Sequence, residues 1–391
     1  MSSKRHSKAT LKYLHSNTQV DLVRRALQLE ILSRENNLYT PNLTRLTLAS
    51  IITERSTELS TSFNDRFSKC FPLHAPFTIP RYQTFAKQAL SSLLAGISYF
   101  HGTWLVDRHT HSSYDEEEEN FWLDATEQRM QSQGAVLEGP AELFTATPSR
   151  PFFPRGFYWD EGFHLLPVGE WDNDLALEVI RSWFSLMDED GWIAREQILG
   201  EESRQKVPLE FRAQYPHYAN PPTLLMPIAA FVERLQKLPA ETKNLGQEVL
   251  GIEDLFSEKI TRRYLDNPEL ARDYLEKLYP LLQRHHEWFR RTQAGDIKSW
   301  DREAFSTKEG YRWRGRTPDH CLTSGLDDYP RARPPHTGEL HVDLLSWMGF
   351  FARTLKGVAA YLEQTDDVAE LSRIENAIIK NLDGIFPLDV G

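Results

Sequence analysis

The chain has 391 residues, 40% of them hydrophobic, which is enough to bury a sizeable core in roughly one to three domains. Its formal net charge of −11 argues against a nucleic-acid-binding surface, because phosphate binding requires clustered lysine and arginine. The ten tryptophans and fourteen tyrosines exceed what packing requires, and they favour a carbohydrate or aromatic ligand.

Several other classes of protein are also disfavoured by the sequence. The N-terminus has basic residues but lacks the apolar region of a signal peptide, and no window reaches the roughly 18 apolar residues of a membrane span. The cysteines, Cys70 and Cys321, form no CxxC pair, which leaves a disulfide or two free thiols open. The adjacent His285 and His286 would point apart on a helix, so we expect no metal and no other cofactor.

Residues 1–80 are expected to form a polar N-terminal tail followed by linker helices. Residues 1–18 are polar, and apolar side chains at helical spacing predict helices over residues 20–32 and about 43–67. Asn42 begins an Asn-Leu-Thr sequon, which carries a glycan only if the chain is lumenal.

Residues 81–391 are expected to form a second, helical domain. Its first helix is predicted over residues 84–100, where leucines recur at helical spacing. Residues 107–140 break this pattern and are interpreted as an insertion. The acidic run 115–119 inside it is interpreted as a solvated loop rather than a metal site.

The remaining helices are predicted from caps and periodicity. Asp172 or Asp174 caps a helix over 175–187, and Asn220 is expected to cap one that ends near residue 238. Residues 240–258 are polar and partly helical, and further helices are predicted over 268–292, 342–362 and 366–382. Strand signals are scarce, so paired helices joined by long loops predict an all-α toroid, which is incomplete because the helices are too few to close it.

Residues 149–200 combine aromatic and charged side chains more densely than an ordinary core segment does. Aromatic rings can cover the apolar face of a pyranose, while carboxylates and guanidiniums bind its hydroxyls. Composition alone favours the alternative, a helix-bundle core with a charged rim. The tryptophans concerned are Trp159, Trp171, Trp183 and Trp192.

The order of the sequence blocks favours the sugar-binding interpretation over the helix-bundle core. The blocks PFFPRGFYWDEGFHLLP, DGWIAREQILG, YRWRGR, SGLDDYPRA and ELHVDLLSW follow one another from residue 151 to residue 347, within a similarity that begins near residue 71. In this order they resemble the processing α-glucosidases of glycoside hydrolase family 63. The resemblance implies an (α/α)6 toroid that removes, with inversion, the terminal α-1,2-linked glucose from the N-glycan precursor on nascent glycoproteins in the endoplasmic reticulum. Members also have an N-terminal membrane helix and a β-rich domain, so we expect this chain to be part of such an enzyme.

Asp327 is the candidate for the general acid. Inverting glycosidases need two carboxyl groups about 6.5–9.5 Å apart, one an acid and the other a base that activates water. The neighbouring Asp328 can raise the pKa of Asp327, which suits an acid. By itself the sequence favours a capping Asp pair in a turn. The resemblance, which extends to a similar block in the related trehalases, assigns Asp327 to catalysis and Asp328 to substrate binding.

The block around Asp160 is the candidate sugar subsite. By the same resemblance Asp160 and Arg155 bind hydroxyls of the cleaved sugar, and Trp159 forms a wall of the subsite. Glu161 and His164 are candidates to assist them. One alternative makes Asp160 the acid, and another makes Asp160 and Glu161 an ordinary acidic helix start.

Glu339 and Asp343 stand four residues apart, which predicts one shared helical face. The resemblance links them with substrate binding and with catalysis, whereas acidic residues at a helix start are the plain alternative. The other expected substrate-binding residues could instead form structural arginine–carboxylate pairs or core. They are Trp192, Arg195, Glu196, Trp313 and Arg314.

Two blocks that the resemblance implies, Tyr-Trp-Arg-Gly and a Trp-Glu-x-Tyr-like block, are missing from this sequence. The resemblance implies that the general base is a glutamate in a Trp-Glu-x-Tyr-like block, which does not occur here, and Asp383 and Asp389 lack its aromatic setting. We therefore expect the base to lie outside these residues and the chain alone to turn over weakly. A binding remnant without activity and a trehalase-like hydrolase are the alternatives, and a helical scaffold protein is a more distant one.

Overall fold

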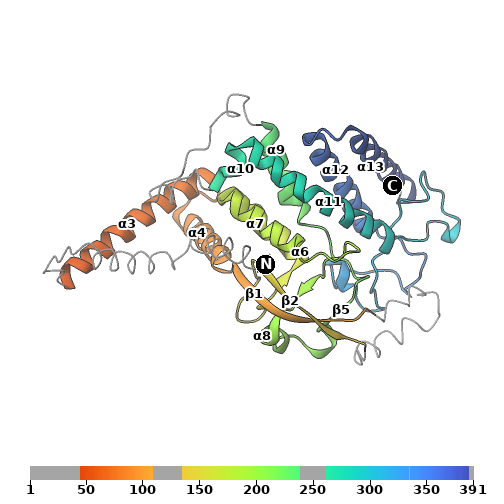
Figure 1. The fold of residues 1–391 in the computed structure, drawn as a ribbon, viewed down its shortest axis with the longest axis horizontal. Coiled ribbons are helices and arrows are strands. Elements are labelled where there is room, and N and C mark those ends of the chain that lie inside the picture. The colour runs from red at the N-terminus through yellow and green to blue at the C-terminus, as the bar shows by residue number, and fades with distance from the viewer. Residues whose placement is uncertain (1–44, 109–133, 238–260, 334, 387–391) are drawn as a thin grey trace, which may run out of the picture. The chain divides into compact units, whose positions relative to one another are not determined.

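The computed structural model describes residues 45–108, 134–237, 261–333 and 335–386 (Figure 1). The chain divides into two compact units, which are described separately. The first contains residues 1–91 and 249–257, and the second contains residues 92–248 and 258–391. The predicted helix 20–32, the Asn42 sequon and the polar segment 240–258 lie outside the described residues.

The first unit contains helix α3 (Arg45–Cys70) and most of helix α4 (Pro80–Ala95). The bounds of α3 confirm the helix predicted over about 43–67 from residue 45 onward. Near the end of α3 the ring of Phe67 contacts those of Phe63 and Phe71. The prediction that the next helix reaches residue 100 is wrong, because α4 ends at Ala95. A strand follows it, since aromatic and β-branched side chains fit a pleated surface better than a helix.

A three-stranded sheet opens the second unit. Strand β1 (Ser98–Val106) pairs antiparallel with β2 (Val136–Thr145) and parallel with the short β5 (Ala213–Gln214). Strand β2 begins at Val136, so the C-terminal end of the segment 107–140, interpreted as an insertion, belongs to this sheet. Gly139 and two glutamates obscured the strand pattern of β2, and burial of Leu143 outweighs their low strand propensity.

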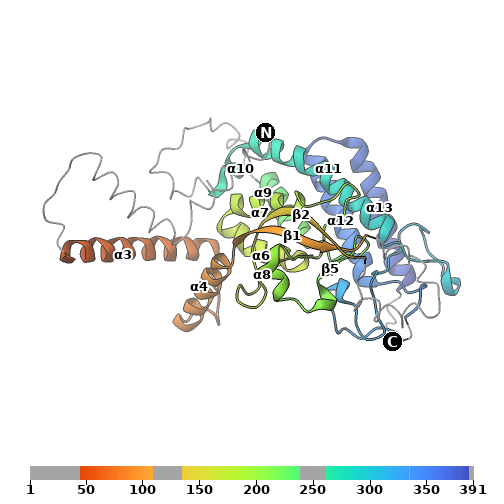
Figure 2. The same ribbon diagram turned by 60° about the horizontal axis from the view of Figure 1, so that its bottom comes forward.

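The rest of the second unit is mainly helical (Figures 1 and 2). Helix α6 contacts α7 and α9, and α12 contacts α9, α11 and α13. A second small sheet pairs β3 with β4. The element bounds are α6 Tyr158–Trp171, α7 Asn173–Phe184, α8 Gly200–Gln205, α9 Leu225–Lys237, α10 Arg263–Asp266, α11 Pro268–Thr292, α12 Val342–Tyr361, α13 Thr365–Ile385, β3 Gly156–Phe157 and β4 Glu196–Gln197.

The helix caps test the predictions made from local sequence. Asp172 accepts a hydrogen bond from the backbone N of Leu175 at 2.9 Å, which confirms it as the cap of α7. The predicted helix 268–292 has the same bounds as α11. Asn220 does not cap α9, because the two prolines after it keep the chain out of the helical region and its side chain bonds instead to the carbonyl of Thr323.

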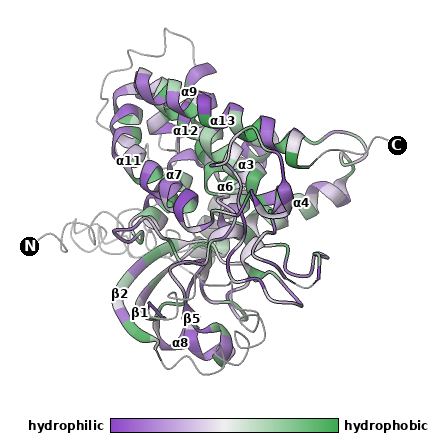
Figure 3. Ribbon diagram, turned by 90° about the vertical axis from the view of Figure 1, so that its right-hand side faces the viewer, coloured by the Kyte–Doolittle hydropathy of each residue, from purple (hydrophilic) through white to green (hydrophobic). Residues whose placement is uncertain are grey.

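The hydrophobic core lies between the helices and the inner face of the sheet. The long helices carry hydrophilic and hydrophobic residues together, as expected for helices with one buried face (Figure 3). The largest fully buried aromatic side chains include Trp183, Phe231, Phe289 and Phe351. Burying each of them contributes roughly 1.5–3 kcal/mol. No described helix has both the length and the apolar character needed to cross a bilayer.

Candidate active site

The PRGFYWDE and DGWIAREQ blocks meet at the small sheet. Phe157 on β3 pairs with Glu196 on β4, and the backbone N of Tyr158 donates to the carbonyl of Arg195 at 2.9 Å. Helix α6 starts at Tyr158, so its first turn presents Trp159 and Asp160 directly beyond this pairing.

The SGLDDYPRA block packs against the same turn. Gly325 adopts a left-handed φ of 73°, and a Cβ atom placed there would lie 2.7 Å from the Trp159 ring. Arg195 holds the start of this loop, because its Nη1 donates to the carbonyl of Leu322 at 2.6 Å. Three sequence blocks therefore converge on one site, with Trp159 covering the loop that carries Asp327.

The two candidate carboxyl groups lie in a common electrostatic environment. Burial is the main factor that raises the pKa of Asp327; the charges of Asp328 and Glu196 raise it further, while Arg195 lowers it. Burial also raises the pKa of Asp160, to which the charges of Glu196 and Asp327 add. The structure thus brings Asp160 and Asp327 within electrostatic range of each other, in an arrangement that favours protonated carboxyl groups.

Glu161 and His164 lie behind Asp160. The Glu161 side chain is fully buried, and its two oxygens bond to the backbone N of Ala146 and to Nδ1 of His164, both at 3.1 Å. Burial lowers the pKa of His164, but the charges of Glu161 and Asp160 outweigh it, so the net pKa is raised. His164 therefore tends toward its protonated form beside Asp160, and Glu161 fixes both the histidine and the end of β2.

Glu196 lies between two arginines. Its Oε2 is 2.8 Å from Nε of Arg155 and its Oε1 is 2.8 Å from Nη2 of Arg195. The Arg155 guanidinium also stacks over the Phe157 ring, with 4.6 Å to the ring centroid. These three charged side chains are therefore held together, and the sequence alone had left arginine–carboxylate pairing as one of two interpretations.

Three other predicted wall residues are built into the surrounding structure. Trp192 is 1% exposed and stacks on Trp104 with 5.7 Å between ring centroids. Trp313 is fully buried, and its Nε1 donates to Asp343 at 3.0 Å. The Arg314 guanidinium donates to backbone carbonyls at the end of α11, so all three stabilise the loops of the site.

Glu339 and Asp343 do not share a helical face, which corrects that prediction. Helix α12 begins at Val342, so Glu339 lies in the loop before it. Each carboxylate has an arginine partner instead. Glu339 pairs with Arg316 at 3.0 Å and Asp343 with Arg331 at 3.0 Å.

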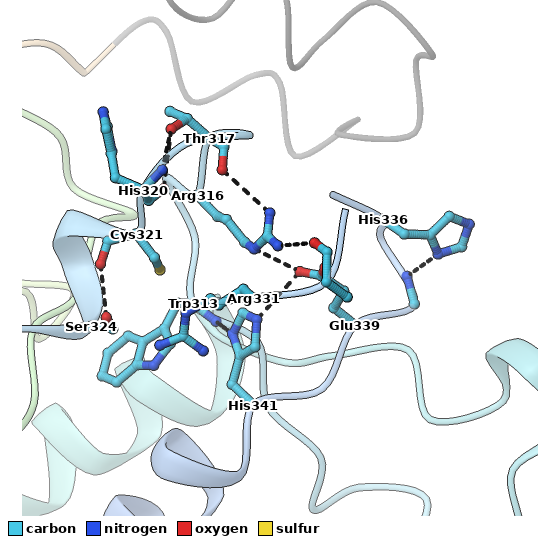
Figure 4. Close-up of polar contacts among 12 residues, drawn as sticks. Trp313, Arg316, Thr317, His320, Cys321, Ser324, Arg331, His336, Glu339 and His341 are labelled. Carbon is cyan, nitrogen blue, oxygen red and sulfur yellow. Dashed lines mark hydrogen bonds and ion pairs between the residues drawn. The ribbon is translucent and has the colours of Figure 1, made fainter. Parts of the chain in front are cut away.

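Both ion pairs are largely buried, and Figure 4 shows how Arg316, Glu339 and His341 lie beside one another. His341 lies between the two ion pairs, with Nε2 3.4 Å from Glu339 and Nδ1 accepting from the backbone N of Trp313. Burial is the main factor that lowers the pKa of His341. Sequence reasoning missed Arg316 and Arg331, although both stand in the YRWRGR and SGLDDYPRA blocks, where the density of arginine was a usable signal.

A polar cavity of about 250 Å³ adjoins the loop that carries Asp327. Its lining includes Thr317, Asp319, His320, Asp328 and Arg331. Asp328 thus faces a space that could admit a polar ligand. Among the described residues, no group of three or more histidine, cysteine or acidic side chains is placed to hold a metal ion. Both cysteines are free thiols.

Sequence comparisons relate this chain to known proteins. The profile of the glycosyl hydrolase family 63 C-terminal domain matches residues 47–386. A "probable mannosyl-oligosaccharide glucosidase" of Schizosaccharomyces pombe is 50% identical over 331 residues, covering 82% of this chain and 40% of the relative. The mannosyl-oligosaccharide glucosidase of Saccharomyces cerevisiae is 41% identical over 349 residues, covering 87% of this chain and 41% of that protein. Alpha-glucosidase 2 of Arabidopsis thaliana is 33% identical over 332 residues, covering 83% of this chain and 35% of that protein. The chain therefore spans about 40% of the length of the two yeast relatives.

Proposed function

Because the chain belongs to glycosyl hydrolase family 63, we propose that it carries the sugar-binding and acid-bearing part of a glucosidase of N-glycan processing. The proposed substrate is the glucosylated high-mannose N-glycan precursor, and the proposed reaction is inverting hydrolysis of its terminal α-1,2-linked glucose. The observation that carries the proposal is the convergence of Asp160 and Asp327 beside Trp159 from blocks far apart in the sequence.

In the proposed reaction Asp327 protonates the glycosidic oxygen as the C–O bond breaks. Its burial favours the protonated form, as a general acid requires. Asp160 accepts hydrogen bonds from hydroxyls of the departing glucose, and the Trp159 ring covers the sugar's apolar face. Asp343 and Glu339 support the loop that closes the site, through Arg331 and Arg316.

Inversion also requires a base that activates water on the opposite face of the sugar. The proposed base is the glutamate of the family's Trp-Glu-x-Tyr block, which does not occur in these 391 residues. That observation favours a second candidate function, in which the chain binds glucose-capped glycans without cleaving them. Whole-protein activity and substrate are proposals in either case, since the chain spans about 40% of the yeast relatives.

The proposal extends to the architecture and the location of the protein. The second unit is proposed to be part of an (α/α)6 toroid, with the motif-bearing loops at one end. The pairing of α12 with α13 and of α6 with α7 supports this arrangement. The proposed location is the lumen of the endoplasmic reticulum, where the precursor glycan is trimmed.

Hydrolysis of defined glucosides tests the proposed function. The chain is incubated with a triglucosylated N-glycan, with trehalose and with buffer alone, and the released glucose and its anomer are followed by ¹H NMR. Weak release of β-glucose from the N-glycan supports the proposal, because the proposed base lies outside these residues. Asp327→Asn is expected to reduce that release by about 10²–10⁴-fold, while the exposed Asp273→Asn on α11 retains it.

The other outcomes separate the alternatives. Cleavage of trehalose but not of the N-glycan identifies a trehalase-like hydrolase. Saturable binding of the N-glycan without release of glucose identifies a binding protein that lacks its base. Absence of both binding and cleavage contradicts the proposed function.

A further inference from the structure

Glu196 is shielded from any sugar in the site. The residue is 5% exposed, and each of its carboxylate oxygens is within 2.8 Å of an arginine nitrogen, from Arg155 on one side and Arg195 on the other. A sugar hydroxyl could reach this carboxylate only by displacing one of two charge-assisted hydrogen bonds, which are stronger than a neutral one.

The backbone around Glu196 is equally fixed. Glu196 pairs with Phe157 across the β3–β4 ribbon, and its backbone N donates to Oε1 of Gln214 at 3.2 Å. The side chain of Glu196 therefore joins the segment before β3, through Arg155, to the segment before its own strand, through Arg195. Truncating it would leave two buried or half-buried guanidinium groups without their carboxylate partner.

Arg195 connects Glu196 to the loop that carries Asp327, the proposed general acid. Its Nη2 binds Glu196, while its Nη1 donates to the carbonyl of Leu322 at 2.6 Å. The loop is closed at its base, since the backbone N of Cys321 donates to the carbonyl of Asp327 at 3.2 Å. A guanidinium held by Glu196 thus fixes the start of a turn whose other end is Asp327.

We propose that Glu196 is a positioning residue: it touches no substrate and holds Arg195 in place on the loop that presents Asp327. This inference rests on the proposed function, in which Asp327 is the general acid. It replaces the substrate-binding role that the family resemblance suggested for Glu196, and it assigns Arg195 to the loop rather than to the sugar.

The proposal predicts pKa shifts of opposite sign at Asp327 for its two main variants, because Glu196 and Arg195 carry opposite charges. Loss of the Glu196 charge lowers the pKa of Asp327, because Glu196 raises it. Loss of the Arg195 charge raises it, because Arg195 lowers it. The other charged groups that interact with this carboxyl, Asp328, His320 and Asp160, are unchanged in both variants. A general loss of local packing would move the pKa of Asp327 in one direction in both variants.

The experiment follows the Asp327 carboxyl directly. The ¹³Cγ signals of labelled aspartates are titrated by NMR, and the signal of Asp327 is assigned from its absence in Asp327→Asn. Glu196→Gln is expected to lower the pKa of Asp327 and Arg195→Met to raise it. Glu196→Asp, which keeps the negative charge, is expected to leave the pKa of Asp327 raised as in the wild type.

The molecule offers a matched control. Glu375 on α13 is also clamped by two cations, with Arg353 Nε at 2.7 Å and with Lys356, and it is 7% exposed. Glu375→Gln makes the same chemical change on a helix that contributes nothing to the described site, so it is expected to leave the titration of Asp327 unchanged.

Kinetics give a second readout if the chain turns over. Glu196→Gln is expected to lower kcat by about 10²-fold, the cost of a displaced catalytic group. KM should stay within about threefold, because no substrate contact is lost. A rise in KM at unchanged kcat would overturn the proposal by showing that Glu196 binds the sugar.

The titration also separates this proposal from the proposed function. If Glu196→Gln and Arg195→Met shift the pKa of Asp327 in opposite directions in a chain that neither binds nor cleaves glycans, both side chains lie beside the Asp327 carboxyl as the positioning role requires, while the proposed function fails. An unchanged pKa in both folded variants overturns the positioning role. If Glu196→Gln does not fold, the kinetics of Arg195→Met decide: the positioning role requires a lower kcat with KM within about threefold, and a rise in KM at unchanged kcat overturns it.

Discussion

At the scale of single residues, the site is built from carboxyl groups in surroundings that favour their protonated form. Asp327 and Asp160 both have raised pKa values, with burial as the main cause, and Arg195 is the nearby cation that opposes the shift at Asp327. The adjacent carboxylates Asp327 and Asp328 in the sequence predicted a raised pKa for Asp327. What the sequence could not give is the partner from a distant block, because only the fold brings Arg195 and Glu196 to Asp327.

A first prediction concerns pH. A general acid must be protonated, so activity is retained below its pKa and lost as pH rises through it. Because the pKa of Asp327 is raised, the basic limb of the kcat profile is expected to lie above the range of an ordinary aspartate. The measurement is kcat against pH on the N-glycan. A basic limb within the ordinary aspartate range would contradict the assignment of Asp327.

A second prediction concerns Gly325. Alanine there would adopt a left-handed φ of 73°, at a cost of roughly 1–2 kcal/mol, and its Cβ would meet the Trp159 ring at 2.7 Å. Gly325→Ala is expected to lower both the free energy of unfolding and the affinity for glucose, as followed by urea unfolding and calorimetry.

Gly384→Ala serves as the control for that variant. Gly384 lies in α13, and a Cβ atom added there would meet no other atom within 4 Å. Alanine is therefore expected to stabilise the helix by about 0.5–1 kcal/mol and to leave glucose binding unchanged. Equal glucose affinity in wild type and Gly325→Ala would show that Trp159 does not depend on the glycine at position 325.

At the scale of elements, local sequence rules succeeded where the signal is local. Helix α11 matches its predicted bounds because Asn267 caps it and Pro268 occupies its first turn. The β1–β2 pair was missed because half of the evidence for each strand lies in its partner, many residues away. Glu339 was placed on a helical face with Asp343, but the loop before α12 is held by ion pairs with Arg316 and Arg331 rather than by helix hydrogen bonds.

A third prediction concerns the cap of α7. Asp172 is 2% exposed and accepts the hydrogen bond of the Leu175 backbone N. Asp172→Ala is expected to lower the free energy of unfolding by about 1–2 kcal/mol, whereas Asp172→Asn, which can also cap, should lose much less. Urea unfolding of both variants measures this difference, and equal losses would indicate that the charge rather than the cap is important.

A fourth prediction concerns the buried histidines of α11. Burial lowers the pKa of His285 to about 4 and that of His286 to about 3. The unfolded chain, with histidine pKa values near 6.5, therefore binds more protons than the native state between these limits. The free energy of unfolding should be highest above pH 6.5 and should fall as pH drops toward 4, by up to roughly 1.4 kcal/mol per pH unit for each histidine.

His286→Leu removes one of the two histidine contributions to the pH dependence of the free energy of unfolding. His286 packs against Phe351 with 5.0 Å between ring centroids, so leucine keeps an apolar contact while removing the titrating group. The variant should lose stability less steeply with acid than the wild type. Parallel slopes for wild type and His286→Leu would contradict a neutral buried imidazole.

His285 links these elements to the site. Its Nδ1 is 2.7 Å from the carbonyl of Gly191, which can only accept, so Nδ1 carries the proton. Its Nε2 therefore accepts from the hydroxyl of Tyr158 at 2.8 Å. A neutral histidine on α11 thus anchors the first turn of α6, directly before Trp159 and Asp160.

At the scale of the whole molecule, the family and its motif blocks were evident from the sequence, and the arrangement of those blocks was not. The predicted substrate-binding residues divide into three groups that no local pattern separates. Some border the site with Asp160 and Asp327, some form its arginine–carboxylate supports, and others, such as Trp192 and Trp313, belong to the core. Burial decides among them, and burial is set by contacts between blocks far apart in the chain.

A crystal structure of this chain with D-glucose tests the central claim most directly, because it requires binding and not turnover. We expect glucose against the Trp159 ring, with its hydroxyls bonded to Asp160 and with the Asp327 carboxyl within hydrogen-bonding distance of the anomeric oxygen. Glucose bound elsewhere, for instance only in the cavity lined by His320 and Arg331, would contradict the assignment of Asp160 and Asp327 to the sugar-cleaving site.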